Sequence, residues 1–219
     1  FAREGFPACV PRRTEDALTP LVERIREEGG QARGFGCDAR DEDQMQALVD
    51  TIETEVGPLE VVVFNIGANV HFPIRETTAR VYRKVWEMAA FAGFLTGREA
   101  ARVMVPRGRG TILFTGATAS LRGGRGFAAF AGAKFALRAL AQSMARELGP
   151  EGIHVAHTVI DGAIDTAFIR DNFPERYALK DRDGILDPEH IADAYWTLHR
   201  QPRDTWTHEL DLRPWMETF

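Results

Sequence analysis

Apolar and polar residues follow two patterns along the chain, one typical of helices and one of buried strands. Residues 14–28 and 42–56 carry apolar side chains at helical spacing, and glycine follows each segment. The runs 59–65, 111–116 and 153–160 are mostly apolar and rich in β-branched residues, as in strands covered on both faces.

The remaining segments continue the alternation. They are strands at 6–10, 31–38 and 205–212, and helices at 77–105, 127–148 and 188–200. Strands that alternate with helices predict an α/β fold with a parallel sheet and helices on both faces. No linker, repeat or change in composition divides the chain, so we expect a single domain over residues 1–219.

Composition narrows the classes of partner. The formal net charge is −5 with acids and bases interspersed, which favours neither a nucleic acid nor a membrane as partner. Cys9 and Cys37 are the only cysteines, and two residues make neither a disulfide framework nor a metal motif. We therefore expect a cytoplasmic protein without a metal site.

One lysine lies in an unexpected place. Lys134 has Phe130, Leu137 and Ala141 at helical spacing, so it projects from the apolar face of its helix. A buried ammonium group is costly without a partner. On structural grounds alone, Lys134 would extend to the surface or pair with a carboxylate such as Asp161.

Polar and glycine-containing motifs follow the predicted strands, where ligands bind in parallel sheets. They are CDAR (37–40), NIGAN (65–69), TGATAS (115–120), FAGAK (130–134) and IDGAIDT (160–166). Their order and spacing, over essentially the whole chain, resemble the short-chain dehydrogenase/reductase family. The resemblance implies a Rossmann-like, doubly wound parallel sheet and an oxidoreductase that uses NAD or NADP.

Members of this family begin with a strand and a glycine-rich loop that binds the cofactor pyrophosphate at a helix N-terminus. Residues 1–6 resemble the end of that helix, so the first strand and the loop are absent from this sequence. We expect about 20 residues to precede residue 1, from the usual lengths of a strand, a loop and a helix.

The catalytic positions of the family are mostly replaced. Lys134 matches the lysine that hydrogen-bonds the nicotinamide ribose and lowers the pKa of the catalytic tyrosine. Phe130 stands at the tyrosine position, Ala117 at the serine position, and Ala89, or Ala90 after a shift of one residue, at the asparagine position. The resemblance therefore favours ribose hydroxyls as the partner of Lys134 and leaves no acid/base for ordinary carbonyl reduction.

Positions that bind the cofactor in the family are better preserved. Asp38 matches the acid that accepts from the adenine amino group, Asn65 and Gly67 the loop past the adenosine ribose, Gly162 the turn glycine, and Thr166 the threonine at the carboxamide. Simpler explanations remain open: Asp38 and Thr166 as helix caps, and Gly67 as an ordinary turn glycine. Asp161 replaces the family proline.

Two arginines bear on which dinucleotide is bound. Arg12 and Arg13 follow the strand after which NAD-dependent members present an acid to the ribose 2′-hydroxyl. Two arginines and no acid favour a 2′-phosphate, hence NADP over NAD. Solvated surface charge is the alternative explanation.

Other polar groups could replace the missing acid/base. They are His71, Thr115, Thr118, Ser120, His157 and Asp161. Strand parity could instead bury His157 in the core, as is usual for a lone histidine.

Three functions remain open at this stage. We favour an NADP(H)-binding oxidoreductase of unknown substrate, with segment 167–187 as the substrate lid and pairing of copies through the long helices, including 127–148. The alternatives are an inactive nucleotide-binding pseudoenzyme or partner subunit, and a structural relative that no longer binds nucleotide. The retained Lys134, Asp38, Asn65 and Thr166 argue against the last.

Overall fold

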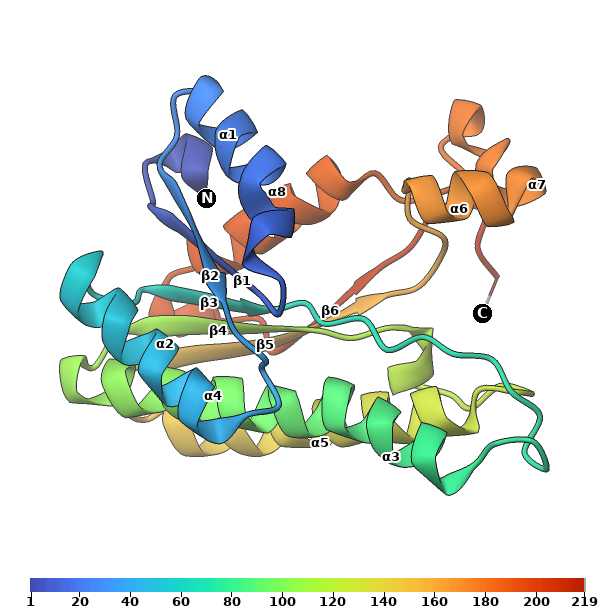
Figure 1. Ribbon diagram of the computed structural model, residues 1–219, viewed down its shortest axis with the longest axis horizontal. Coiled ribbons are helices and arrows are strands. Elements are labelled where there is room, and N and C mark those ends of the chain that lie inside the picture. Colours follow the sequence, from blue (N-terminus) through green and yellow to red (C-terminus); the bar gives the residue numbers. More distant parts are fainter. Residues whose placement is uncertain (219) are drawn as a thin grey trace.

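Strands and helices alternate along the chain in the computed structural model, which describes residues 1–218 (Figure 1). The strands are β1 (Ala8–Arg12), β2 (Ala32–Gly36), β3 (Val61–Phe64), β4 (Gly110–Thr115), β5 (Ile153–Ile160) and β6 (Glu209–Leu212). The helices are α1 (Thr19–Glu27), α2 (Glu42–Glu55), α3 (Ala79–Trp86), α4 (Ala92–Met104), α5 (Ala128–Leu148), α6 (Ala167–Asn172), α7 (Pro174–Tyr177) and α8 (Pro188–His199).

All strand pairs are parallel, but the strands form two pieces rather than the single sheet that we expected. β1 pairs with β2, and β3, β4, β5 and β6 pair in that order. Between β1 and β3 lies a cavity of about 800 Å³ that residues of both strands line. Within residues 1–218 no strand pairs with the edges of β1 and β3 that face this cavity.

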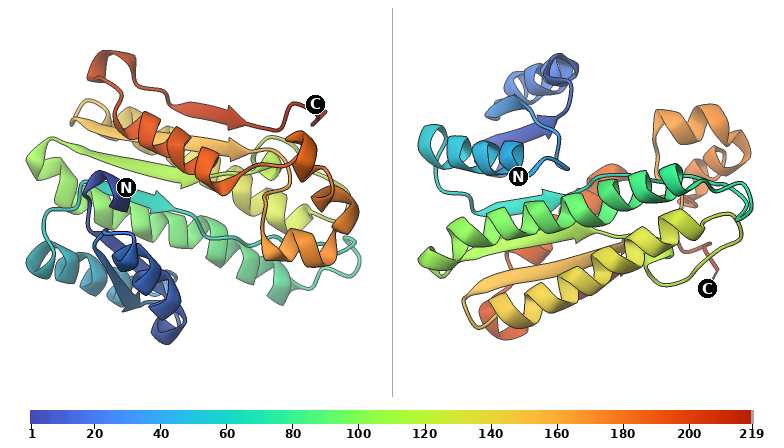
Figure 2. Two further views of the ribbon diagram at one scale, coloured as in Figure 1. Left: turned by 90° about the horizontal axis from the view of Figure 1, so that it is seen from above. Right: turned by 60° about the horizontal axis from the view of Figure 1, so that its bottom comes forward.

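Helices cover both faces of the larger sheet, as the alternation predicts. On one face, α4 and α5 lie side by side and bury the centre of the core, which includes Met104, Phe114 and Leu137 (Figures 1 and 2). On the other face, Tyr195 and Leu198 of α8 pack on β4 and β5. This is a Rossmann-like α/β fold, and it brings the carboxyl ends of β4 and β5 together above α5.

Three predicted boundaries were wrong. The last strand was expected from residue 205, but β6 begins at Glu209. The first strand was expected to end before Pro11, but Pro11 and Arg12 belong to β1. Proline is tolerated there because, among residues 1–218, β1 pairs with a strand on one side only. The predicted helix 77–105 is interrupted by a π-helical segment, Glu87–Phe91, between α3 and α4.

Candidate active site

Lys134 lies on the buried face of α5, at the carboxyl end of β4. The residue is 3% exposed, and its Nζ donates a hydrogen bond of 2.8 Å to the backbone carbonyl of Thr115. Burial lowers the pKa of Lys134 to about 8. The lysine neither reaches the surface nor pairs with Asp161, and no carboxylate within residues 1–218 forms an ion pair with it. One backbone carbonyl accounts for one of its three N–H donors.

The residues that we matched to the catalytic positions of the family pack close to one another, and one of them, Phe130, lies beside Lys134. Ala89, Ala90 and Phe130 belong to buried regions of the core, and Ala117 packs against the same apolar cluster as Ala89 and Phe130. The Phe130 ring centroid is 5.9 Å from the Lys134 Nζ. Apolar side chains therefore surround the ammonium group on this side.

The two alanines that compete for the asparagine position lie in the π-helical segment. Ala89 is fully buried, and Ala90 is 6% exposed. Segments of this kind are rare and are frequent at functional sites. The local widening of the helix places both alanines in the interior, next to the elements that position Lys134.

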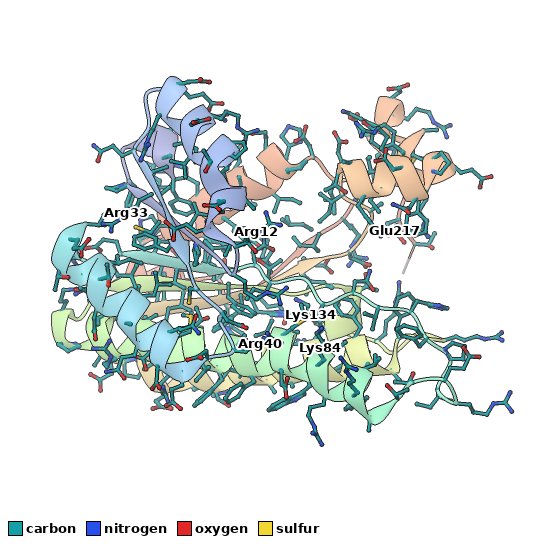
Figure 3. The ribbon with its side chains drawn as sticks, viewed as in Figure 1. Arg12, Arg33, Arg40, Lys84, Lys134 and Glu217 are labelled. Atoms are coloured by element: carbon teal, nitrogen blue, oxygen red, sulfur yellow. The ribbon has the colours of Figure 1, made fainter. Side chains whose placement is uncertain are left out.

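Four of the residues expected to bind the cofactor line the cavity between β1 and β3. They are Arg12, Arg13, Asp38 and Asn65. Both arginines are exposed at the end of β1, and Arg12 projects toward the middle of the molecule (Figure 3). Gly67 is exposed, and a Cβ at this position would meet no atom within 4 Å, so there is open space in front of its backbone.

Asp38 is held by Arg40, which lies two residues later in the chain. Arg40 donates to both carboxylate oxygens of Asp38, at 2.9 and 2.5 Å. Hydrogen bonding to Arg40 lowers the pKa of Asp38 to about 2. Asp38 does not cap α2, because Asp41 does so by accepting from the Gln44 N–H.

Gly162 and Thr166 follow β5, outside the lining of that cavity. Gly162 has a φ of 153°, and a Cβ there would lie 2.7 Å from the Pro214 Cδ, so the position requires glycine. The Thr166 hydroxyl caps α6 by accepting from the Ile169 N–H at 3.3 Å, which is the simpler of the two roles considered for it.

Three of the polar side chains considered as replacements for the acid/base already have partners within the protein. The Thr115 hydroxyl bonds Tyr195 of α8, on the opposite face of the sheet. Ser120 is fully buried, and its hydroxyl accepts from the Ala117 N–H at 3.1 Å. The His71 ring packs edge-on against Phe127, 4.9 Å between centroids.

His157 is a core histidine held by a charged pair. It is fully buried on β5, and its Nδ1 lies 3.2 Å from Oε2 of Glu209 on β6. Arg138 of α5 donates to both Glu209 oxygens at 2.6 and 2.7 Å. Burial lowers the pKa of His157 to about 4, and hydrogen bonding to Arg138 lowers that of Glu209. A Cβ at Gly116 would overlap the imidazole, so that glycine covers the ring.

Sequence reasoning missed Arg40, Arg138 and Glu209. Arg138 lies one helical turn after Lys134 on the same face of α5, a spacing that could have drawn attention to it. Glu209 could not have been found in this way, because only the register of β5 and β6 places it opposite His157.

Comparison with known protein families decides the relationship. The family model described as short chain dehydrogenase matches residues 1–176. The chain belongs to this family. The resemblance stated from the motifs is thereby confirmed, as is the Rossmann-like fold that it implied.

Individual relatives agree with this assignment. Zerumbone synthase of Zingiber zerumbet is 31% identical over 179 residues, which are 80% of this chain and 66% of that protein. The crystal structure of a short-chain dehydrogenase from Rhodopseudomonas palustris is 51% identical, with a TM-score of 0.83, and the match covers 98% of this chain and 90% of that one. A 7α-hydroxysteroid dehydrogenase, solved with NADH and 7-oxo glycochenodeoxycholic acid, is 26% identical with a TM-score of 0.85 over 97% and 85% of the two chains.

The chain spans just under two thirds of zerumbone synthase and 61% of a second plant relative, a (21S)-21-acetoxyl-apo-melianone synthase of Melia azedarach. No helix between residues 1 and 218 has both the length and the apolar character to cross a bilayer. In the same part of the chain, no three His, Cys, Asp or Glu side chains group as metal ligands would.

Proposed function

We propose that this chain is an NADP(H)-binding oxidoreductase that works without the tyrosine and serine of its family. The observation that carries the proposal is the buried ammonium of Lys134, whose hydrogen-bond partner within residues 1–218 is a single backbone carbonyl. The other N–H groups of this ammonium group need hydrogen-bond acceptors, and the hydroxyl oxygens of a ribose could accept from them. The residues present therefore fit a nicotinamide dinucleotide.

The other side chains expected to bind the nucleotide support the same proposal. Arg12 and Arg13 offer two guanidinium groups at the edge of one cavity, a donor set that suits a phosphate. The open space in front of Gly67 would admit a ribose close to the backbone. Asp38 would accept from an adenine amino group while Arg40 keeps it ionised.

When bound, a nicotinamide would supply hydride transfer to or from a carbon of the substrate. Lys134 would hold the ribose and thereby orient the ring. The apolar cluster around Phe130 would keep water away from one side of the reacting atoms. The segment 167–187, which contains α6 and α7, stands apart from the sheet and would cover the substrate (Figure 1).

The test is a titration of the full protein, as its gene encodes it, with NADPH and with NADH, followed by nicotinamide fluorescence. We expect NADPH to bind more tightly. Replacing Arg12 and Arg13 together by alanine should weaken NADPH binding about 10- to 100-fold, because hydrogen bonds to a charged group contribute about 1.5–3 kcal/mol. NADH binding should be unchanged.

Arg33→Ala is the matched control, since Arg33 is a half-exposed arginine of β2 that pairs with Glu55 (Figure 3). Equal affinity for the two dinucleotides would remove the 2′-phosphate from the proposal. Absence of binding by either would overturn the nucleotide site as a whole.

A second candidate function is that of an inactive nucleotide-binding partner protein. Ala89, Ala117 and Phe130 pack in one apolar cluster, so the polar groups of the family were replaced by side chains that fit one another. Turnover of any alcohol or carbonyl compound by the wild-type protein would exclude this candidate.

We also propose that two copies pair through the outer faces of α4 and α5. Phe94 of α4 and Phe135 of α5 are 40% and 42% exposed, and paired helices would cover both rings. Replacing both residues by glutamate should shift the mass measured by light scattering from a dimer or tetramer to a monomer. A wild-type monomer at micromolar concentration would contradict the proposal.

A further inference from the structure

A threonine and an aspartate are joined at the carboxyl ends of β4 and β5, beside the position of the lost serine. Thr118 follows Ala117 directly, and its hydroxyl donates a short hydrogen bond to Oδ1 of Asp161. Asp161 follows β5, where its N–H bonds the Leu212 carbonyl at 2.8 Å. The two side chains thus close the gap between two neighbouring strand ends.

The two residues differ in burial. Asp161 is 4% exposed, whereas Thr118 is half-buried. A buried carboxylate requires compensation. Besides the hydrogen bond from the Thr118 hydroxyl, Asp161 forms an ion pair with Arg213, whose Nη2 lies 3.8 Å from its Oδ2. That guanidinium also pairs with Asp211. Asp161 is therefore a buried carboxylate that is connected to the partly exposed surface through the hydroxyl group of Thr118.

The other polar groups near Ala117 are committed elsewhere. Ser120 is fully buried and accepts from the Ala117 N–H. His157 is fully buried against Glu209. Lys134 donates to the Thr115 carbonyl and has no lone pair with which to accept a proton while it is charged. The hydroxyl group of Thr118, in contrast, belongs to a partly exposed residue and is hydrogen-bonded to a carboxylate.

We propose that Thr118 and Asp161 form the acid/base pair of this site, with Thr118 as the catalytic residue and Asp161 as the positioning residue that receives its proton. The substrate class is an alcohol or the corresponding carbonyl compound. This assignment rests on the proposed oxidoreductase function and names the proton path that the function needs.

Oxidation of an alcohol combines a proton relay through Thr118 with the loss of a hydride from the substrate carbon. The substrate O–H bond breaks and its proton passes to Thr118 Oγ1, while the hydroxyl proton of Thr118 passes to Asp161 Oδ1. A bound oxidised nicotinamide would supply the two-electron acceptor for the hydride that the substrate carbon releases when its carbon–hydrogen bond breaks. The carbon–oxygen double bond forms, and reduction follows the same path in reverse.

The test compares Thr118→Val, Thr118→Ser and Asp161→Asn in the full protein. Reduction of NADP is measured with a panel of primary and secondary alcohols, and nucleotide affinity is measured by fluorescence. We expect Thr118→Val and Asp161→Asn to lower kcat by about 10²- to 10⁴-fold, the usual contribution of general acid/base catalysis. Nucleotide affinity should stay within about twofold, and Thr118→Ser should keep most of the activity.

Two further readouts separate proton transfer from a structural role. In Asp161→Asn, kcat should fall while the KM for the alcohol stays close to that of the wild type. In the nucleotide-free protein with ¹³C-labelled aspartate, Thr118→Val should shift the infrared carboxylate band that Asp161→Asn removes, and Thr118→Ser should leave it in place. Thr197→Val, on the outer side of α8, is the control for loss of a threonine hydroxyl.

Wild-type kcat in Thr118→Val, or nucleotide binding without turnover of any alcohol or ketone, would overturn the acid/base pair and leave the nucleotide site standing. Absence of nucleotide binding in the wild-type protein would overturn both proposals. If Thr118→Val does not fold, Thr118→Ser and Asp161→Asn still test the proposal. Loss of activity in Thr118→Ser, or wild-type activity in Asp161→Asn, would contradict the proton path.

Discussion

In the Thr118→Val protein, replacing Phe130 by tyrosine together with Ala117 by serine should raise NADPH oxidation with simple ketones by about 10²-fold or more. The Phe130 ring lies 5.9 Å from the Lys134 Nζ, so a phenol there would have a cation beside it. A neighbouring positive charge lowers the pKa of a phenol, and a positioned proton donor contributes about 10²- to 10⁴-fold. The measurement is the initial rate of NADPH consumption over a panel of ketones.

Phe127→Tyr is the matched control, because it adds the same hydroxyl to the same cluster one turn earlier, against His71. It should leave the rate unchanged. If the double variant binds NADPH and gains nothing, the pocket differs from that of the family in more than its acid. The second candidate function, an inactive binding partner, would then be favoured.

The tyrosine hydroxyl should lower the stability of the protein, because the surroundings of Phe130 are apolar. Phe130 is 9% exposed and lies in an apolar cluster with Ala89, so an added hydroxyl needs a partner there. The change Ala117→Ser would place a second hydroxyl near it. The double variant should therefore be better tolerated than Phe130→Tyr alone, which thermal unfolding of the two proteins would show.

Much of the fold followed from hydrophobic periodicity, and the physical reason is burial. The strands predicted at 111–116 and 153–160 are covered by helices on both faces, so their apolar runs leave little ambiguity. The division of the sheet between β1 and β3 could not be predicted from periodicity, because a strand carries the same pattern whether or not its edge is paired. Val63, expected to be buried, is 37% exposed beside that cavity.

The candidate site was predictable only as far as the motifs extend. The pattern placed Lys134 on the apolar face of its helix, and the structure buries it there. Its hydrogen-bond acceptor is a backbone carbonyl. Every residue has one, so the sequence does not indicate which carbonyl the lysine contacts. The bond between Thr118 and Asp161 joins residues 43 positions apart, and it depends on where two strands end. The roles assigned to the nucleotide-binding residues stay predictions.

Acidification should destabilise the protein through His157, with a loss of about 3 kcal/mol in the free energy of unfolding between neutral pH and pH 4. Burial lowers the pKa of His157 from 6.5 to about 4, against the opposing effect of Glu209, while Arg138 and Lys134 add to the lowering. Below pH 6.5 the unfolded chain binds a proton that the folded chain does not, so stability falls as the pH decreases toward 4. Each pKa unit corresponds to about 1.36 kcal/mol.

His157→Asn isolates this contribution, because the asparagine amide can still donate to Glu209 and does not titrate. The free energy of unfolding should be measured with denaturant at a series of pH values. Between pH 6.5 and 4 its slope against pH should be smaller in His157→Asn than in the wild type, by the amount that corresponds to about one proton taken up on unfolding. His154 and His199, whose pKa values burial also lowers, act in the same direction, so the difference between the two proteins is the relevant quantity. An unchanged slope in His157→Asn would mean that the imidazole is protonated in the folded protein, and that Glu209 holds it as a buried ion pair.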